Sequence, residues 1–179
     1  MPDDIVLRCS TILFRGQSVL LVHRTSKELD DWVLPGGSPR VGESMAACAR
    51  REMREETGLA VEPTRVAFVL EAVDPHGGRR TVDLVFAAHG SASGQTFQPQ
   101  EAGMEPEFVA FSRLPDLHMK PPLAGHLPGF FHHGVRRYAP YLGNLWRPDN
   151  GTDSGPPQPP ALDRLYTRLR GRPRPQTDH

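Results

Sequence analysis

Three glutamates on one predicted helix are the residues whose types and spacing are best suited to chemistry. Residues 44–57 have the pattern of a helix, and Gly58 follows where a glycine commonly ends one. At about 100° per residue, Glu52 and Glu56 fall on the apolar face of this helix and Glu55 lies at its edge. The apolar residues of that face are Met45, Cys48, Ala49 and Met53. An ordinary amphipathic helix has aliphatic residues at positions 52 and 56.

Carboxylates on an inward-facing surface need a counter-charge. They repel one another, and a buried unpaired charge costs several kcal/mol. A multivalent cation removes that penalty, and oxygen-only ligands favour Mg²⁺ or Mn²⁺ over zinc. Arg51 lies four residues before Glu55, so it can also pair with a carboxylate and fix its rotamer. The alternative interpretation is a solvated charged face on a surface helix, and the helix alone leaves both open.

The loop before the helix adds a second feature. Gly36, Gly37 and Gly42 follow a predicted short strand over 32–34 and lead into the acidic helix. Glycine lets the backbone approach a ligand closely. The N-terminus of a helix favours an anion. Together, a cation site beside an anion-friendly turn indicates a phosphate-bearing substrate whose charge is neutralised by metal.

Strands separated by turns make up most of the remaining pattern. They are predicted over residues 5–14, 18–23, 32–34, 66–73, 81–89 and 108–111. The sequence Arg15-Gly16-Gln17 predicts a hairpin between the first two strands, and residues 119–147 show no clear period because prolines and glycines interrupt them. One strong helix among many strands favours a mixed α/β or α+β layered fold.

Composition limits the class of protein. The 179 residues correspond to one domain, or one domain with a tail. A net charge of zero argues against broad electrostatic capture of nucleic acid or of an acidic membrane. No apolar run approaches the roughly 18 residues of a membrane helix, and the acidic start over 1–4 is unlike a signal peptide, so we expect a cytoplasmic protein. Residues 148–160 form a Pro/Gly-rich linker, and the tail over 161–179 can form a short helix.

The stretch from Gly37 to Leu59 resembles a complete Nudix box. Gly37 is followed by five residues and then Glu43, and seven more residues lead to Arg51-Glu52-Met53-Arg54-Glu55-Glu56-Thr57-Gly58-Leu59. The lead-in over 32–37 is also similar to that of the family. The resemblance implies a Nudix α/β/α sandwich with a mixed β-sheet, which we expect over residues 1–147. Glu43 would support the junction of loop and helix.

The resemblance also implies a reaction and its residues. It implies hydrolysis of a nucleoside diphosphate linked to another moiety, with Mg²⁺ or Mn²⁺ as cofactor. Glu52, Glu55 and Glu56 would be metal ligands, and the carbonyl of Gly37 would add another. The catalytic residues would be Glu52, Glu56 and Arg51, where Glu52 also positions or deprotonates the water and Arg51 orients the glutamates.

Family members often add a carboxylate from a later loop. Glu105 best fits that place as a further metal ligand, three residues before Phe108. Glu101 and Glu107 are its rivals.

The substrate within this class stays open. Pro75, sixteen residues after the box, favours ADP-ribose or nucleotide sugars slightly, although a turn proline between two strands accounts for it fully. The main competitor is cleavage of a nucleoside triphosphate to the monophosphate, and a non-catalytic Nudix-fold nucleotide sensor is the alternative of another class. Trp32, Arg24 and Arg79 are the candidate substrate contacts, against sheet packing for Trp32 and solvated surface positions for the arginines. A small nucleotide is thus the expected partner, and a homodimer is compatible with the sequence.

Overall fold

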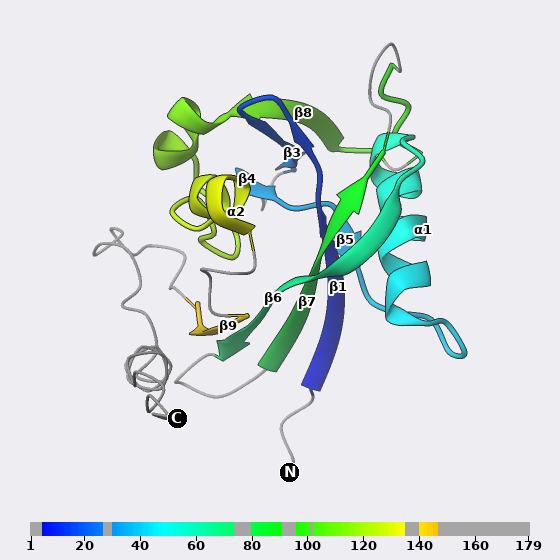
Figure 1. The fold of residues 1–179 in the computed structure, drawn as a ribbon. Coiled ribbons are helices and arrows are strands. Elements are labelled where there is room, and N and C mark those ends of the chain that lie inside the picture. The colour runs from blue at the N-terminus through cyan, green and yellow to red at the C-terminus, as the bar shows by residue number, and fades with distance from the viewer. Residues whose placement is uncertain are drawn as a thin grey trace, which may run out of the picture.

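A mixed five-stranded sheet forms the centre of the computed structural model (Figure 1). The structure describes residues 5–26, 30–73, 80–90, 96–100, 102–134 and 140–146. The strands of this sheet, in spatial order, are β5 (Gly36–Gly37), β1 (Ile5–Ile12), β7 (Arg80–His89), β6 (Glu62–Val73) and β9 (Tyr141–Asn144). Strand β1 runs parallel to β7, whereas β6 runs antiparallel to β7. Parallel and antiparallel pairs therefore coexist in one sheet.

A second sheet surrounds strand β3. Its members are β2 (Phe14–Arg15), β3 (Ser18–Thr25), β4 (Asp30–Val33) and β8 (Met104–Ala110). Strand β3 pairs antiparallel with each of the other three. This second sheet carries Trp32 and Arg24, two of the predicted substrate contacts, and Glu105.

The hairpin predicted at Arg15-Gly16-Gln17 is present, but its first strand is only Phe14–Arg15 and not the whole of residues 5–14. The turn at Gly16 joins β3 to the short β2, whereas β1 belongs to the other sheet. The chain passes from one sheet to the other at Leu13, where both the preceding and following residues form strands. Residues 9–13 are all buried, so the alternation that marks a strand facing one core is lost there. A run of aliphatic residues then resembles one continuous strand.

Helix α1 (Met45–Thr57) confirms the predicted helix and its ends. The side chain of Ser44 accepts a hydrogen bond from the amide of Ala47, which satisfies one free donor of the first turn. Gly58 ends the helix with φ of 78°, a conformation that glycine adopts without steric cost. Cys48 and Ala49 pack against Cys9 and Phe86, which fixes α1 on one face of the five-stranded sheet.

The opposite face of the sheet is covered by the 3₁₀ helix η1 (Phe111–Asp116) and by α2 (Leu127–His133) (Figure 1). Their buried residues Leu114, Leu127 and Phe130 share one core cluster with Phe68 and Val85 of the sheet. Helices on both sides of a mixed sheet give an α/β sandwich, which confirms the predicted fold class.

Sequence reasoning missed α2 and β9 and shortened two strands. Strand β6 begins at Glu62 rather than at residue 66, and β8 begins at Met104 rather than at residue 108. The predicted linker and tail lie outside the described residues, as do Pro75, Arg79 and Glu101. Within the part of the chain that the structure describes, no helix is long and apolar enough to cross a membrane.

Candidate active site

The glycine strand β5 brings the main chain directly against the glutamates of α1. Strand β5 pairs with β1, so that Gly36 lies opposite Ser10 and Gly37 opposite Cys9. A Cβ atom added at Gly37 would lie 2.4 Å from the carboxyl carbon of Glu52. The absence of a side chain at position 37 therefore allows the contact between backbone and carboxylate.

Glu56 and Glu52 are buried at this contact, as the helical spacing predicts. Their exposed fractions are 5% and 9%. The amide of Gly36 donates a hydrogen bond of 2.9 Å to Oε2 of Glu56. This bond holds the Glu56 carboxylate against β5. The predicted inward face of α1 thus does carry two carboxylates.

Arg51 is the positive charge among these carboxylates. Its Nη1 donates to Oε1 of Glu52 at 2.6 Å and to Oε2 of Glu55 at 2.8 Å. Its Nε and Nη2 donate to the two carboxylate oxygens of Glu43 at 2.9 and 3.0 Å. These bonds raise the pKa of Arg51 above its usual value, and the hydrogen bonds to Glu43 are the largest cause. They lower the pKa of Glu43 from 4.5 to about 2, with further help from the Arg40 amide.

The loop between β5 and α1 is fixed to the same network. Nη2 of Arg51 also donates to the carbonyl of Ser38 at 3.2 Å. The side chain of Arg40 forms an ion pair with Glu55 at 3.2 Å. Sequence reasoning missed Arg40; its position three residues before Glu43 was the available signal, because its amide donates to that carboxylate. Loop and helix are therefore connected through Glu43, Arg51 and Glu55.

A divalent cation is compatible with this donor set. Among the residues with described positions, no three Asp, Glu, His or Cys side chains converge as a ready ligand set. The guanidinium of Arg51 instead contacts both Glu52 and Glu55. The available donors are oxygens only, and the missing Cβ of Gly37 leaves its main chain against Glu52. Oxygen donors of this kind suit Mg²⁺ or Mn²⁺.

The structure places Glu105 beside His23 rather than among the α1 glutamates. Glu105 lies opposite His23 in the β3–β8 register, and its Oε2 is 3.8 Å from Nδ1 of His23. The Glu105 side chain is 68% exposed. Its rival Glu107 pairs with Arg113 on the surface. The assignment of a later-loop carboxylate therefore stays a prediction.

The predicted substrate contacts have partners of their own. The ring of Trp32 stacks on that of His23, with centroids 4.5 Å apart and planes 2° from parallel. Trp32 also packs against the main core cluster, as in the alternative interpretation. Arg24 forms two hydrogen bonds of 2.8 Å with the buried carboxylate of Asp31. These contacts fix Trp32 and Arg24 within the second sheet.

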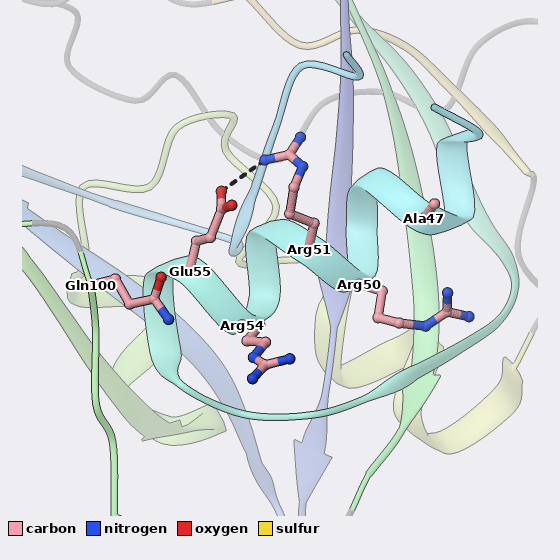
Figure 2. A pocket seen from close by; sticks show the side chains of 6 residues that line it. All are labelled: Ala47, Arg50, Arg51, Arg54, Glu55 and Gln100. Atoms are coloured by element: carbon pink, nitrogen blue, oxygen red, sulfur yellow. Dashed lines mark hydrogen bonds and ion pairs between the residues drawn. The ribbon is translucent and has the colours of Figure 1, made fainter. Parts of the chain in front are cut away.

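A hollow of about 440 Å³ lies on the outer side of α1, next to Glu55. Its lining residues are Ala47, Arg50, Arg51, Arg54, Glu55 and Gln100 (Figure 2). The amide of Gln100 donates to the carbonyl of Glu55 at 2.8 Å, which fixes the segment over 96–100 against the end of the helix. Sequence reasoning missed Gln100 as a neighbour of the site, since its contact with α1 depends on the path of a long connection.

The fold and the site define a class of α/β sandwich proteins in which an acidic helix packs against a glycine strand. The NUDIX domain model matches residues 6–132. The chain belongs to the NUDIX family.

Individual relatives agree with this assignment. The chain is 34% identical over 113 residues to the "Putative ADP-ribose pyrophosphatase YjhB" of Bacillus subtilis, covering 60% of this chain. It spans about half (51%) of the length of that curated relative. A solved MutT NUDIX hydrolase from Burkholderia pseudomallei is 26% identical, with a TM-score of 0.53 over 62% of this chain and 86% of that chain. A NUDIX hydrolase from Nitrosomonas europaea shares the fold, with a TM-score of 0.61 and 16% identity over 74% of this chain and 91% of that chain.

Proposed function

We propose that this protein hydrolyses the pyrophosphate bond of a nucleoside diphosphate linked to another moiety, with Mg²⁺ or Mn²⁺ as cofactor. The observation that carries the proposal is the contact of Glu52 and Glu56 with the glycine strand β5, with Arg51 beside them. The name of the Bacillus subtilis relative supports ADP-ribose as the first substrate to test. Nucleotide sugars present the same type of bond.

The cofactor would be held by oxygen atoms of Glu52, Glu55 and Glu56 and by the carbonyl of Gly37. A divalent cation there would neutralise the pyrophosphate and lower the pKa of a bound water. Arg51 holds one oxygen of Glu52 and one of Glu55, so it sets the orientation of both carboxylates. The Gly36 amide does the same for Glu56.

Glu52 is well placed to receive the proton of the attacking water. Its Oε1 is held by Arg51, while its Oε2 has no hydrogen-bond partner among the described residues. A held carboxylate with one free oxygen can orient a water molecule and accept its proton. Water would attack phosphorus, the bridging P–O bond would break, and two phosphate-bearing products would leave. Positioning and charge neutralisation would supply most of the rate gain.

The activity is tested on a panel of nucleotides and nucleotide sugars with products identified by mass. ADP-ribose should give AMP and ribose 5-phosphate when Mg²⁺ or Mn²⁺ is present. Binding of ADP-ribose without release of AMP, across the whole panel, would contradict the enzyme proposal and favour a nucleotide sensor. Release of pyrophosphate from nucleoside triphosphates alone would move the substrate to the triphosphate class.

Variants of the buried glutamates test the site. Glu52→Gln and Glu56→Gln should each lower kcat at least about 100-fold, which corresponds to about 2.7 kcal/mol of barrier, with the fold retained. Asp116→Asn is the control, because Asp116 is exposed on η1. Circular dichroism and thermal melting check the fold of each variant. Full turnover by both glutamine variants would refute the assignment of the site.

A further inference from the structure

Asp83 of β7 is a buried charge that the proposed reaction does not use. Its exposed fraction is 1%, and it lies on the same face of the five-stranded sheet as Val85, opposite α1. Its Oδ2 accepts a hydrogen bond of 2.8 Å from the hydroxyl of Ser10 and lies 3.7 Å from Nε of Arg8. Its Oδ1 has no hydrogen-bond partner among the described residues. An aliphatic residue at this position would avoid the cost of burying a charge, so the carboxylate calls for a further role.

Arg8 and Ser10 connect Asp83 to the main chain before β5. Nε of Arg8 donates to Oγ of Ser10 at 3.1 Å, and its Nη2 donates to the carbonyl of Leu34 at 3.1 Å. Ser10 lies opposite Gly36 in the β1–β5 register, and a Cβ added at Gly36 would lie 2.8 Å from Oγ of Ser10. Burial raises the pKa of Asp83, whereas Arg8 and Ser10 act against this rise. One guanidinium therefore contacts both the buried carboxylate and the segment that leads into β5.

The main chain held by Arg8 is the one that contacts Glu56. Leu34 lies two residues before Gly36, whose amide donates to Oε2 of Glu56 at 2.9 Å. The carbonyl of the residue between them accepts a hydrogen bond of 2.9 Å from the amide of Thr11. Strand β5 is only two residues long, so it has few backbone hydrogen bonds of its own. The contact of Arg8 therefore helps to determine where the Gly36 amide lies.

We propose that Arg8 and Asp83 are positioning residues that act through the main chain over 34–36 and hold the amide of Gly36 against Glu56. This inference rests on the proposed function and adds a second group of side chains, on the face of the sheet opposite α1, that orients a catalytic glutamate. Arg8 holds the carbonyl of Leu34, and Asp83 holds Arg8 in turn. Groups that support a metal ligand in this way fix its orientation and its affinity for the ion.

Replacement of the ion pair by apolar residues separates positioning from stability. Loss of Arg8 alone would leave Asp83 buried without this counter-charge and would destabilise the fold. The double variant Arg8→Met/Asp83→Val removes both charges, and apolar replacement of a buried ion pair is often neutral for stability. Arg8→Lys is the second variant, because it keeps a charge beside Asp83 but lacks the planar fork that reaches both Ser10 and Leu34.

Hydrogen exchange of the Gly36 amide, followed by NMR on the full chain without metal or substrate, is the first measurement. In both variants this amide should exchange at least about tenfold faster, while the amides within α1 keep their wild-type rates, because only the segment over 34–36 opens more readily. Calorimetry with Mn²⁺ alone is the second measurement. The affinity for Mn²⁺ should fall about tenfold, as is typical when the support of a ligand is lost.

Steady-state kinetics distinguish positioning from contact with the substrate. In both variants kcat should fall at least about tenfold while KM stays within about twofold of the wild type. Arg80→Lys is the matched control, because Arg80 is another arginine of the same sheet whose ion pair, with Glu71, lies outside this network. It should keep the wild-type exchange rate, Mn²⁺ affinity and kcat. A rise in KM at unchanged kcat would make Arg8 a substrate contact and overturn the proposal.

The exchange experiment also separates this proposal from the proposed function. If the wild type hydrolyses a substrate but exchange at Gly36 is unchanged in both variants, the proposed function stands and the positioning role fails. If the wild type hydrolyses no substrate but exchange at Gly36 is faster and Mn²⁺ binds more weakly in the variants, the positioning of Glu56 stands and the catalytic proposal fails. If the double variant does not fold, Arg8→Lys alone decides the outcome.

Discussion

At the scale of single residues, Arg51 organises the candidate site. It contacts three carboxylates and the loop carbonyl of Ser38. The pairing of Arg51 with Glu55 follows from helical spacing and was predictable. The bond with Glu43 comes from the path of the loop before the helix, which local spacing does not determine. Residue types and helical periodicity therefore predicted that Glu52 and Glu56 face inward and that Arg51 can pair with Glu55, while the other partners of Arg51 required the three-dimensional structure.

The Glu43–Arg51 pair should make stability depend on acid. Because the pKa of Glu43 is lowered from 4.5 to about 2, its contribution is fully present above pH 4.5 and is lost as the pH falls towards 2. Urea unfolding of the wild type and Glu43→Gln at several pH values measures this contribution. The difference in unfolding free energy should be constant above pH 4.5 and shrink below it. A difference that is independent of pH would contradict the pairing.

The missing side chain at position 37 should matter more for activity than for folding. In Gly37→Ala the new methyl group would lie 2.4 Å from the Glu52 carboxyl group, so that carboxylate must move. We expect kcat to fall at least about tenfold, because small displacements of catalytic groups are costly. Gly125→Ala is the control, since its Cβ meets no atom within 4 Å. Unchanged turnover in Gly37→Ala would show that Glu52 does not need its present position.

At the scale of elements, β9 extends the fold beyond the region matched by the family model. That model ends at residue 132. Strand β9 pairs parallel with β6, and Leu142 and Leu145 are buried at 6% and 1% exposure. Its short length and the surrounding prolines and glycines concealed it in the sequence, because no period can be recognised over four residues.

Two truncated chains distinguish the contribution of β9 to stability from that of the tail. A chain ending at residue 146 should keep its activity and its melting temperature. A chain ending at residue 134 loses Leu142 and Leu145 from the core, which should cost about 4 kcal/mol or more, a large part of an ordinary domain's stability. Chemical unfolding of both chains measures the difference. Equal stability of the two would show that β9 does not contribute to the core, and loss of activity at residue 146 would assign a role to the tail.

At the scale of the whole molecule, the sequence predicted the layers better than the assignment of strands to sheets. Helix α1 has a polar cap, a glycine end and a strong period, so it was predicted with its ends. The transfer of the chain between sheets at Leu13 has no local signal, since residues on both faces are buried there. The place of Glu105 beside His23 depends on the β3–β8 register, which is a long-range property.

The hydrogen bonds of Arg51 also determine whether the fold depends on a bound cation. Because Arg51 offsets the charge of Glu52 and Glu55 within the polypeptide, the fold does not need the proposed magnesium or manganese ion to balance these two glutamates. If the proposed ion is required for hydrolysis, its removal should lower turnover while leaving the thermal stability of the protein unchanged. The concentration of the ion would then set the rate of hydrolysis without changing the amount of folded enzyme.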